Sequence, residues 1–302
     1  MNNNFKHLDI NDIPLLKKFC HSHQPLISEI NAVNLFIWKD YYNYCWKILN
    51  DHLILIGKKT GGTYFSLQPI GLHCSNKKIL RMISDVFKYD FNEPAVKITR
   101  VEKRFAADLN AEANYSVKPL REHFDYVYLI DKTINLQGKK FENKRNEINK
   151  FSRYISNHEL FIDNVKEKYF DSYLAISKKW SEENKSQDNK QIEAEYKAIS
   201  NALSNAHSLN FTGTTIIIDG KVEGFTICDM LNQNTALIHI QKYNRSIPGL
   251  CVFLTIKTLK SCYNNIKYFN YEQDLGILGL QFSKLSYRPI FLEEKYELTN
   301  FF

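Results

Sequence analysis

Several short motifs that identify large enzyme classes are missing from this 302-residue sequence. It contains no G-x-S-x-G nucleophile elbow, no P-loop, no H-E-x-x-H zinc motif and no G-x-G-x-x-G dinucleotide fingerprint. It also lacks a low-complexity tract, and no apolar run approaches the roughly 20 residues of a membrane span. These absences argue against the corresponding hydrolases, nucleotide-binding enzymes and metalloproteases, and against a chain that crosses a membrane.

Cysteine is sparse, and its spacing indicates neither a disulfide framework nor a metal site. No two of the six cysteines form a C-x-x-C pair, which predicts reduced, mostly buried thiols. The segment MNNNFKHLDIND is polar and has no apolar signal sequence, so we expect a cytoplasmic protein. His21 and His23 form an H-x-H pair without acidic or cysteine ligands at a suitable spacing, and we expect no metal site. The six cysteines are Cys20, Cys45, Cys74, Cys228, Cys251 and Cys262.

The amino-acid composition is that of a globular protein with many aromatic residues. Hydrophobic residues make up 44% of the chain, charged residues 24% and aromatic residues 14%, so a large core can form without disulfides or metals. The length suggests two domains, which we place at residues 1–120 and 121–302, with one large domain as the alternative. The net charge of +7 suits an acidic partner such as a nucleic acid, a nucleotide cofactor or an anionic membrane. A lysine-rich genome would give the same excess.

The order of the predicted elements is similar in the two halves of the chain. Each half begins with helices, continues with three antiparallel strands, and ends with a helix and a further strand. This order predicts an α/β (α+β) fold with an internal architectural repeat. The predicted strands are Cys45–Leu49, His52–Ile56, Thr63–Gln68, Val96–Val101, Tyr126–Ile130, Leu160–Val165, Thr214–Asp219, Val222–Leu231, Thr235–Tyr243, Lys267–Tyr271 and Ile290–Lys295. The predicted helices are Asp9–His21, Ile30–Asp40, Ser75–Asp90, Lys139–Ile155, Glu167–Glu183, Asp188–His207, Pro248–Tyr263 and Gly276–Leu285.

The second half has the element order of the second part of GNAT-type acyltransferases. In that fold the central strand separates from its neighbour, and the next helix directs its N-terminus at a cofactor phosphate. Here the segment after Thr235–Tyr243 has one glycine where the coenzyme A loop, Q/R-x-x-G-x-G/A, has two. It is either a phosphate cradle or a basic turn that enters a helix. The candidate cofactor-binding residues are Gln241, Lys242, Tyr243, Arg245 and Gly249.

Two carboxylates follow the strand Lys267–Tyr271, at the end of a strand where sites in α/β proteins commonly form. Glu272 and Asp274 could share a cleft, which would raise the pKa of one carboxyl group and supply a base for an amine. Alternatively, Asp274 caps the next helix and Glu272 is a solvated or ion-paired neighbour. His239 lies in an alternating strand, and it either faces the cleft as a base or packs against the sheet.

Several segments together resemble one bacterial protein family. The most specific are a G-K-K-F-x-x-K-R-N run from Gly138, an E-x-D-L-G run from Glu272 and a K-x-S-Y-x-P run from Lys284. They resemble the uncharacterised, DUF2156-type family whose fold is similar to the C-terminal domain of the phosphatidylglycerol lysyltransferases, over about residues 120–296. The resemblance implies two tandem GNAT-like lobes. It also implies transfer of an amino acid from aminoacyl-tRNA, as in the similar Fem-type enzymes.

Our first functional hypothesis is therefore an acyl or aminoacyl transferase without a tightly bound cofactor. Its donor would be aminoacyl-tRNA, which we favour, or acyl-coenzyme A, and its acceptor an amine or hydroxyl of a small molecule or peptide. The acceptor would attack the carbonyl while Glu272, Asp274 or His239 takes the proton, and backbone N–H groups or Lys242 would stabilise the oxyanion. The residues predicted to bind the acceptor or the tRNA are Lys144, Arg145, Asn146, Lys284 and Tyr287.

Two other hypotheses stay open. Gln241, Tyr271 and Gln281 are neutral where the family pattern is charged, which favours a non-catalytic GNAT-fold module that binds a small ligand or a partner. A peripheral membrane enzyme is the weaker hypothesis, because no helix combines strong basicity with exposed Trp or Phe. Peripheral membrane contact is therefore not expected.

Overall fold

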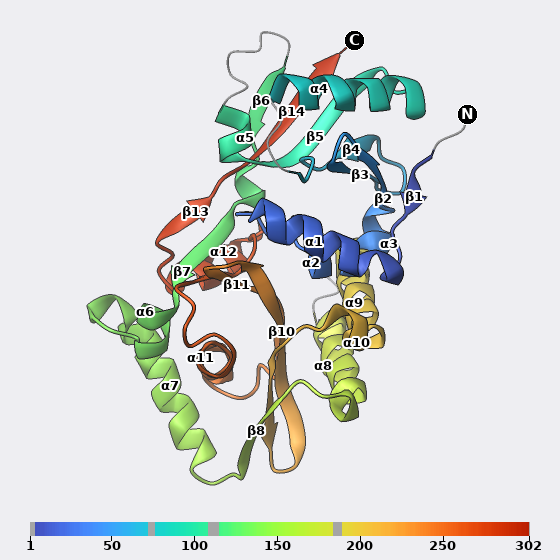
Figure 1. The fold of residues 1–302 in the computed structure, drawn as a ribbon. Helices are drawn as coiled ribbons and strands as arrows, with labels where there is room; N and C mark the ends of the chain where they lie inside the picture. Colours follow the sequence, from blue (N-terminus) through green and yellow to red (C-terminus); the bar gives the residue numbers. More distant parts are fainter. Residues whose placement is uncertain (1–3, 72–75, 108–114, 184–188, 302) are drawn as a thin grey trace. The chain divides into compact units, whose positions relative to one another are not determined.

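The chain forms two compact units in the computed structural model, which describes residues 4–71, 76–107, 115–183 and 189–301 (Figure 1). Lobe 1 consists of Met1–Asp125, Gln273–Gly276 and Leu292–Phe302, and lobe 2 of Tyr126–Glu272 and Ile277–Phe291. Each lobe is built on one seven-stranded sheet. The sequence suggested a single boundary after residue 120, whereas in the structure two later segments also belong to lobe 1.

Lobe 1 is a mixed, mostly antiparallel sheet with helix α4 (Asn76–Asp85) packed on it. Ile79 and Ile83 of this helix share one buried cluster with Ile54, Ile56 and Ile98 of the sheet. A π-helical turn, Val86–Asp90, continues α4. The strands, in sheet order, are β1 (Lys6–His7), β2 (Cys45–Leu49), β3 (His52–Lys58), β4 (Tyr64–Ser66), β5 (Ala95–Glu102), β14 (Lys295–Phe301) and β6 (Ser116–Pro119). The other helices are α1 (Ile13–His23), α2 (Ala32–Ile37), α3 (Lys39–Tyr42) and α5 (Lys103–Ala107).

Lobe 2 has a second mixed sheet with helices on both faces. Its strands, in sheet order, are β13 (Phe291–Glu293), β7 (Asp125–Leu129), β12 (Tyr268–Asn270), β11 (Thr235–Tyr243), β10 (Lys221–Asn232), β9 (Thr214–Ile218) and β8 (Leu160–Asn164). Its helices are α6 (Ile130–Asn135), α7 (Glu142–Ile155), α8 (Phe170–Glu183), α9 (Asn189–Ser204), α10 (Ala206–Leu209), α11 (Leu250–Cys262) and α12 (Leu278–Ser286).

Neighbouring residues of β10 show which helices cover which face of this sheet. Gly224 faces Leu254 of α11, and Phe225 stacks on Tyr173 of α8 with ring centroids 4.3 Å apart. Because successive residues of a strand point to opposite faces, α11 and α8 lie on opposite sides of the sheet (Figure 1). The apolar face of α11 meets α7, where Phe151 and Phe253 stack at 4.2 Å.

Most of the predicted strands and helices are confirmed, and the differences lie mainly at their ends. The predicted helix Gly276–Leu285 begins only at Leu278, because Gly276 belongs to a turn with φ +73°. The predicted strand Ile290–Lys295 is in fact two strands, β13 and β14. Strands β1 and β6 were not predicted. Ser75 and Asp188, the predicted first residues of two helices, lie outside the described residues.

The same strand plan recurs in the two lobes, as the sequence predicted. In lobe 1, β2, β3 and β4 are antiparallel and β5 is parallel to β4, paired at Ser66 and Ile98. In lobe 2, β9, β10 and β11 are antiparallel and β12 is parallel to β11, with Leu237 opposite Asn270 as the last pair. In each lobe the parallel strands pair briefly and then separate.

The cysteines in the described part of the chain are thiols: Cys20, Cys45, Cys228, Cys251 and Cys262. Cys20, Cys45 and Cys228 are buried. Burial raises the pKa of the Cys45 thiol to about 11. Such thiols are protonated at neutral pH and pack as small apolar groups. Cys74 lies outside the described residues.

Candidate active site

The candidate site begins at an irregularity in β11, at the point where β11 and β12 separate. Ile227 lies opposite Ile240 and Cys228 opposite Ile238, so His239 is an extra residue, a β-bulge. The ring of His239 is completely buried although the residue as a whole is partly exposed, so its exposed part is main chain. Bulges often redirect a side chain next to a functional site. Here the bulge directs the imidazole toward the turn that follows β12.

That turn presents Glu272 to the imidazole. Nδ1 of His239 lies 3.2 Å from Oε1 of Glu272, and the carboxylate side chain is 16% exposed. Glu272 has φ +54°, a left-handed conformation that is uncommon for a residue other than glycine. Two backbone contacts hold it: its N–H donates to Oδ1 of Asn270 at 2.7 Å, and its carbonyl accepts from Tyr126 at 3.2 Å. The turn therefore fixes a carboxylate between a buried histidine and solvent.

The other ring nitrogen of His239 has no partner. Nε2 is buried and makes no hydrogen bond to any described residue. The described polar contact of the ring is therefore the one between Nδ1 and Glu272. Through this contact His239 positions the carboxylate of Glu272.

The second predicted carboxylate, Asp274, belongs to a different lobe from Glu272. It belongs to lobe 1, where it is 1% exposed. Oδ1 accepts from the N–H of Gly276 at 2.8 Å, and Oδ2 accepts from Arg121 at 3.1 Å. Asp274 therefore caps the turn at Gly276 and not the next helix, because α12 begins at Leu278 and its N-cap residue, Ile277, makes no side-chain cap hydrogen bond.

Gln241 and Tyr287 belong to a buried polar network against the first turns of α11. The amide of Gln241 donates to the carbonyl of Cys251 at 3.1 Å and accepts from the hydroxyl of Thr255 at 3.1 Å. The hydroxyl of Tyr287 lies 3.4 Å from that of Thr255, and burial raises the pKa of Tyr287 well above its usual range. A carboxylate at position 241 could not donate to the Cys251 carbonyl. The neutral glutamine is therefore matched to its structural neighbours.

Lys242 faces the opposite side of the sheet, under α8 and α9. Its ammonium group lies 2.7 Å from Glu195 and 3.2 Å from the ring centre of Trp180. Burial lowers the pKa of Lys242, although Glu195 opposes that shift. Arg245 lies 5.4 Å from the same Trp180 ring. Both cations predicted for the cofactor loop are therefore engaged with Trp180, and the described contacts of Lys242 do not include the His239 pair.

Gly249 is required for helix packing. It has φ +73°, and a Cβ at this position would lie 2.0 Å from the carbonyl oxygen of Glu147 in α7. Only glycine fits a left-handed residue that close to another backbone. Tyr243 packs at the edge of the same apolar cluster as Phe151 and Leu254, and burial raises the pKa of its hydroxyl.

The residues predicted to bind acceptor or tRNA are, with one exception, engaged inside lobe 2. Lys144 lies 3.0 Å from Glu147 and 4.1 Å from the ring centre of Tyr287. Arg145 donates to the carbonyls at the end of α6, at 2.5 and 2.7 Å. Lys284 donates to the carbonyl of Tyr271 and so supports the turn that carries Glu272. The exception, Asn146, is exposed on α7.

The sequence did not single out Asn270, Thr255 and Cys251, although each contacts a predicted site residue. The role of Asn270 could have been predicted from the sequence, because an asparagine two residues before a turn residue often bonds to the backbone of that residue. The other two had none. Their role depends on how α11 packs against β11, which no local pattern reveals.

The described residues also bear on metal binding and membrane spans. Over the described ranges, no three His, Cys, Asp or Glu side chains gather into a group that could hold a metal ion. Of the H-x-H pair, His23 lies 3.6 Å from Glu102. Among the described helices, none has the length and apolar character needed to cross a membrane.

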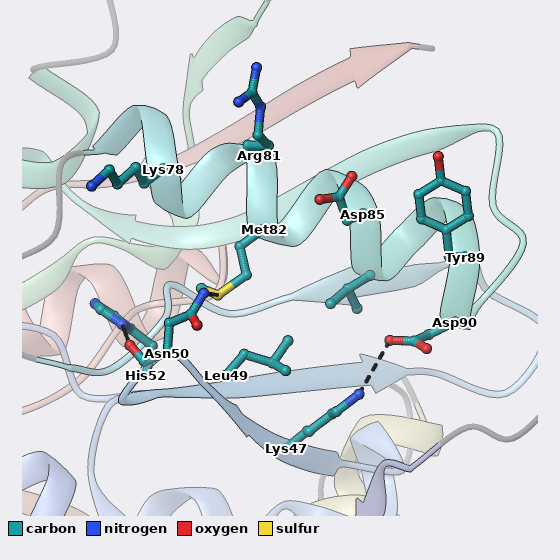
Figure 2. A pocket seen from close by; sticks show the side chains of 11 residues that line it. Lys47, Leu49, Asn50, His52, Lys78, Arg81, Met82, Asp85, Tyr89 and Asp90 are labelled. Atoms are coloured by element: carbon teal, nitrogen blue, oxygen red, sulfur yellow. Dashed lines mark hydrogen bonds and ion pairs between the residues drawn. The ribbon is translucent and has the colours of Figure 1, made fainter.

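Lobe 1 contains a surface groove of about 600 Å³ between β2 and α4 (Figure 2). Leu49 and Met82 form part of its wall, and Lys47 lies 3.9 Å from Asp90 across one end. None of the residues that the sequence predicted for the site lines this groove.

The fold and the site define a class of protein. The two sheets share one order and direction of strands, and each contains a parallel strand pair that separates. Together they form a tandem GNAT fold. A tandem GNAT protein from the clavulanic acid biosynthesis pathway shares this fold, with a TM-score of 0.52 and 10% identity, over 99% of this chain and 98% of that one. The family model for the C-terminal part of phosphatidylglycerol lysyltransferase matches residues 25–299. The chain belongs to this family.

Other similar proteins include two solved structures and one relative. A conserved protein of unknown function from Bacteroides thetaiotaomicron VPI-5482 has a TM-score of 0.89 and 25% identity, over 98% of this chain and 99% of that one. L-PGS from Bacillus licheniformis has a TM-score of 0.67 and 14% identity, over 98% of this chain and 92% of that one. An uncharacterized protein of Mycoplasmoides gallisepticum is 24% identical over 195 residues, which are 61% of this chain and 59% of that protein.

Proposed function

We propose that this protein is an aminoacyl transferase that moves an activated amino acid to an amine or hydroxyl acceptor. Membership of the phosphatidylglycerol lysyltransferase C-terminal family supports aminoacyl transfer in general. The observation that carries the proposal is the His239–Glu272 pair, which lies where β11 and β12 separate. A carboxylate fixed at that position can take a proton from an attacking acceptor.

In the proposed reaction the acceptor nitrogen or oxygen attacks the carbonyl carbon of the donor ester. A bond forms between the carbonyl and the acceptor, and the bond between the carbonyl and the donor oxygen breaks. Glu272 takes the acceptor's proton, because it is 16% exposed whereas the ring of His239 is fully buried. Glu272 then gives this proton to the departing donor oxygen, which leaves as a hydroxyl, so the step needs no covalent enzyme intermediate and no redox partner. His239 acts as a positioning residue.

The favoured donor is aminoacyl-tRNA, with acyl-coenzyme A as the alternative. The lone glycine of the loop before α11, Gly249, is explained by its contact with α7, which weakens the argument for a coenzyme A phosphate cradle. A tRNA donor would place the reaction in the cytoplasm. The acceptor would be a small molecule or a peptide with a nucleophilic amine or hydroxyl.

Differential scanning fluorimetry tests the donor class. Uncharged tRNA, lysyl-tRNA, coenzyme A and acetyl-coenzyme A are each added to the purified protein. A ligand at about 100 times its dissociation constant adds about 2.7 kcal/mol and shifts the melting temperature by a few degrees. A shift with tRNA species alone supports aminoacyl transfer, and a shift with coenzyme A alone replaces it with acyl-coenzyme A chemistry. Silence with all four ligands contradicts both donors.

A second candidate function is a non-catalytic binding module. The observation in its favour is that Gln241, Lys242 and Lys284 are all engaged in contacts within lobe 2. If this candidate holds, the wild-type protein has no transfer activity. Replacement of Glu272 can then change ligand binding only.

A further inference from the structure

Helix α12 exposes apolar side chains and buries its charged one, the reverse of an ordinary surface helix. Its charged residue, Lys284, is buried, whereas Leu278 is 67% exposed, Phe282 70% and Leu285 41%. These three side chains are spaced at i, i+4 and i+7, so they form one stripe along the helix. Lys284 is the only charged residue between positions 277 and 287. A helix that buries its lysine and exposes its leucines is built to meet an apolar partner.

The exposed apolar surface continues past the end of the helix. Six of the eleven exposed large hydrophobic side chains found in the described residues lie between positions 278 and 291. We call the stripe Leu278, Phe282 and Leu285, together with Ile290 and Phe291 after the helix, the α12 face; Leu280 lies on the other side of the helix, one turn before Lys284. Such side chains are normally scattered singly on a soluble surface, and a contiguous group indicates an interaction site.

Positive charges border the α12 face. Arg288 is exposed directly after the helix, and its Nε donates to the carbonyl of Lys140 at 3.3 Å, which brings the exposed Lys139–Lys140 loop to this edge. At the other end, the ring of Phe291 lies 6.4 Å from that of Tyr268, over which Lys267 extends at 4.9 Å. The acidic residue beside the loop, Glu142, leaves this border net positive. We call Lys139, Lys140, Lys267 and Arg288 the basic rim.

We propose that the α12 face and its basic rim dock this protein on the surface of an anionic lipid bilayer. An uncharged apolar stripe enters the boundary between headgroups and acyl chains, and the surrounding cations stay at the level of the lipid phosphates. Two copies joined through this face would bring two positive rims together, which disfavours self-association. The proposal reverses the expectation from sequence, because Phe282 is exposed on a helix whose lysine is turned inward. It is independent of the donor and acceptor proposed above.

Vesicle sedimentation tests the proposal with the full chain. Vesicles contain phosphatidylcholine alone or phosphatidylcholine mixed with phosphatidylserine, an anionic lipid chosen without reference to any acceptor. We expect binding to the mixed vesicles at low salt, little binding to the neutral ones, and weaker binding as salt screens the rim. Phe282→Gln should lower the partition coefficient at least about tenfold, because the face then loses the phenyl ring that would enter the bilayer. Lys140→Glu should lower it roughly tenfold through the reversed charge.

A matched control removes another exposed phenyl ring of the same lobe. Phe161 on β8 is 55% exposed, and Phe161→Gln should bind the mixed vesicles like the wild type. No binding of the wild type to anionic vesicles would overturn the proposal, as would equal binding by Phe282→Gln and the wild type. A dimer in sedimentation velocity that Phe282→Gln dissociates, without vesicle binding, would instead assign the face to a second copy of the chain. Transfer activity measured without lipid is unaffected by these outcomes, so this proposal and the transferase proposal can fail separately.

Discussion

Solvent access distinguishes the two members of the His239–Glu272 pair, and it assigns their roles at the scale of single residues. The histidine ring is buried and the carboxylate reaches the surface. We expect Glu272→Gln, which keeps the size of the side chain but cannot take a proton, to lower the transfer rate at least about 100-fold. The measurement is the discharge of radiolabelled aminoacyl-tRNA with a cell extract as the acceptor pool. The shift that tRNA gives in fluorimetry should remain.

Asp274→Asn is the matched control for that experiment. The new amide can still accept from the N–H of Gly276, but the ion pair with Arg121 is lost. Because Asp274 caps a turn of lobe 1, we expect a modest loss of stability and unchanged turnover. Equal loss of turnover in the two variants would show that Glu272 has no special role.

A second prediction at this scale concerns pH. Burial, reinforced by Glu102 and Asp125, raises the pKa of Glu293 from 4.5 to about 7. The folded state therefore holds this proton more tightly than the unfolded state, and its contribution to stability falls as the pH rises from about 4.5 to about 7. Glu293→Gln imitates the protonated form. It should stabilise the protein by ~1–3 kcal/mol at pH values above this window and have little effect below it.

Urea denaturation of wild type and Glu293→Gln on both sides of that window measures the difference. A stabilisation of the same size at both ends would mean that the effect comes from packing and that the carboxyl group does not titrate in the predicted range.

At the scale of elements, the contact between α7 and α11 depends on one glycine. Gly249→Ala would place a methyl group 2.0 Å from the Glu147 carbonyl oxygen at a residue with φ +73°. We expect a loss of roughly 2–4 kcal/mol in the free energy of unfolding, from backbone strain and overpacking together. Gly279→Ala is the control, because a Cβ there meets nothing within 4 Å. In a helix it should stabilise by about 0.5–1 kcal/mol. Similar effects of the two substitutions in urea would contradict the packing argument.

The repeated strand plan extends to backbone conformation. Arg100 follows the paired Ile98 by two residues, and Glu272 follows the paired Asn270 by two residues. Both have φ +54°. In lobe 1, however, the residue at this position is a buried guanidinium, with its central carbon 4.6 Å from the ring centre of Tyr42. The two lobes thus share a left-handed residue two positions after the pair, inside β5 in lobe 1 and just after β12 in lobe 2. In lobe 2 this residue carries a partly exposed carboxylate.

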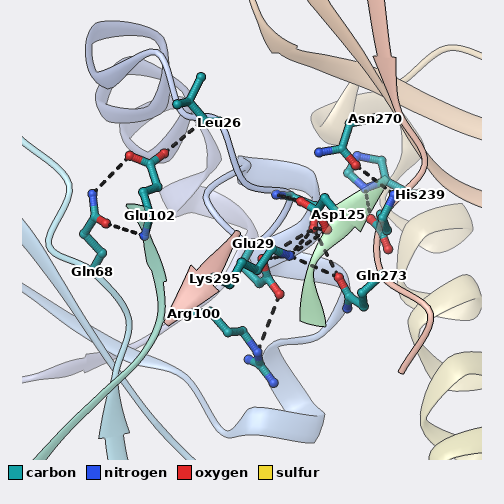
Figure 3. A network of polar contacts seen from close by, with 12 residues as sticks. Leu26, Glu29, Gln68, Arg100, Glu102, Asp125, His239, Asn270, Gln273 and Lys295 are labelled. Atoms are coloured by element: carbon teal, nitrogen blue, oxygen red, sulfur yellow. Dashed lines mark hydrogen bonds and ion pairs between the residues drawn. The ribbon is translucent and has the colours of Figure 1, made fainter. Parts of the chain in front are cut away.

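At the scale of the whole molecule, one lysine holds together the separate segments of lobe 1. Nζ of Lys295 is completely buried and lies 2.5 Å from Glu29, 2.6 Å from Asp125 and 3.2 Å from Gln273 (Figure 3). Burial would lower the pKa of Lys295, but Asp125 and Glu29 outweigh it and raise that pKa above its usual value. Because Lys295 and these three partners come from four distant parts of the sequence, the cluster explains how β14 returns to lobe 1.

Lys295→Met should therefore destabilise lobe 1 strongly. It removes the buried ammonium group that pairs with both Asp125 and Glu29, and we expect a loss of about 3–5 kcal/mol. Hydrogen exchange followed by mass spectrometry should show lost protection in β5 and β14 and retained protection in β10. In the control Lys97→Met, the partly exposed pair with Glu297 is lost, and the change should be within about 1 kcal/mol. Equal effects of both substitutions would contradict the role given to Lys295.

The sequence by itself determined the α/β class, the repeated strand plan and the family. Alternation of apolar residues, turn signals such as Asp219-Gly220 and the motif runs are local, so they can be read without neighbours. Only the tertiary structure decided which polar side chains stay available for chemistry. The surroundings of Lys242 come from α8 and α9, and Lys284 is buried because the turn after β12 receives it. Burial and hydrogen bonding depend on residues far apart in the chain, and no local pattern contains them.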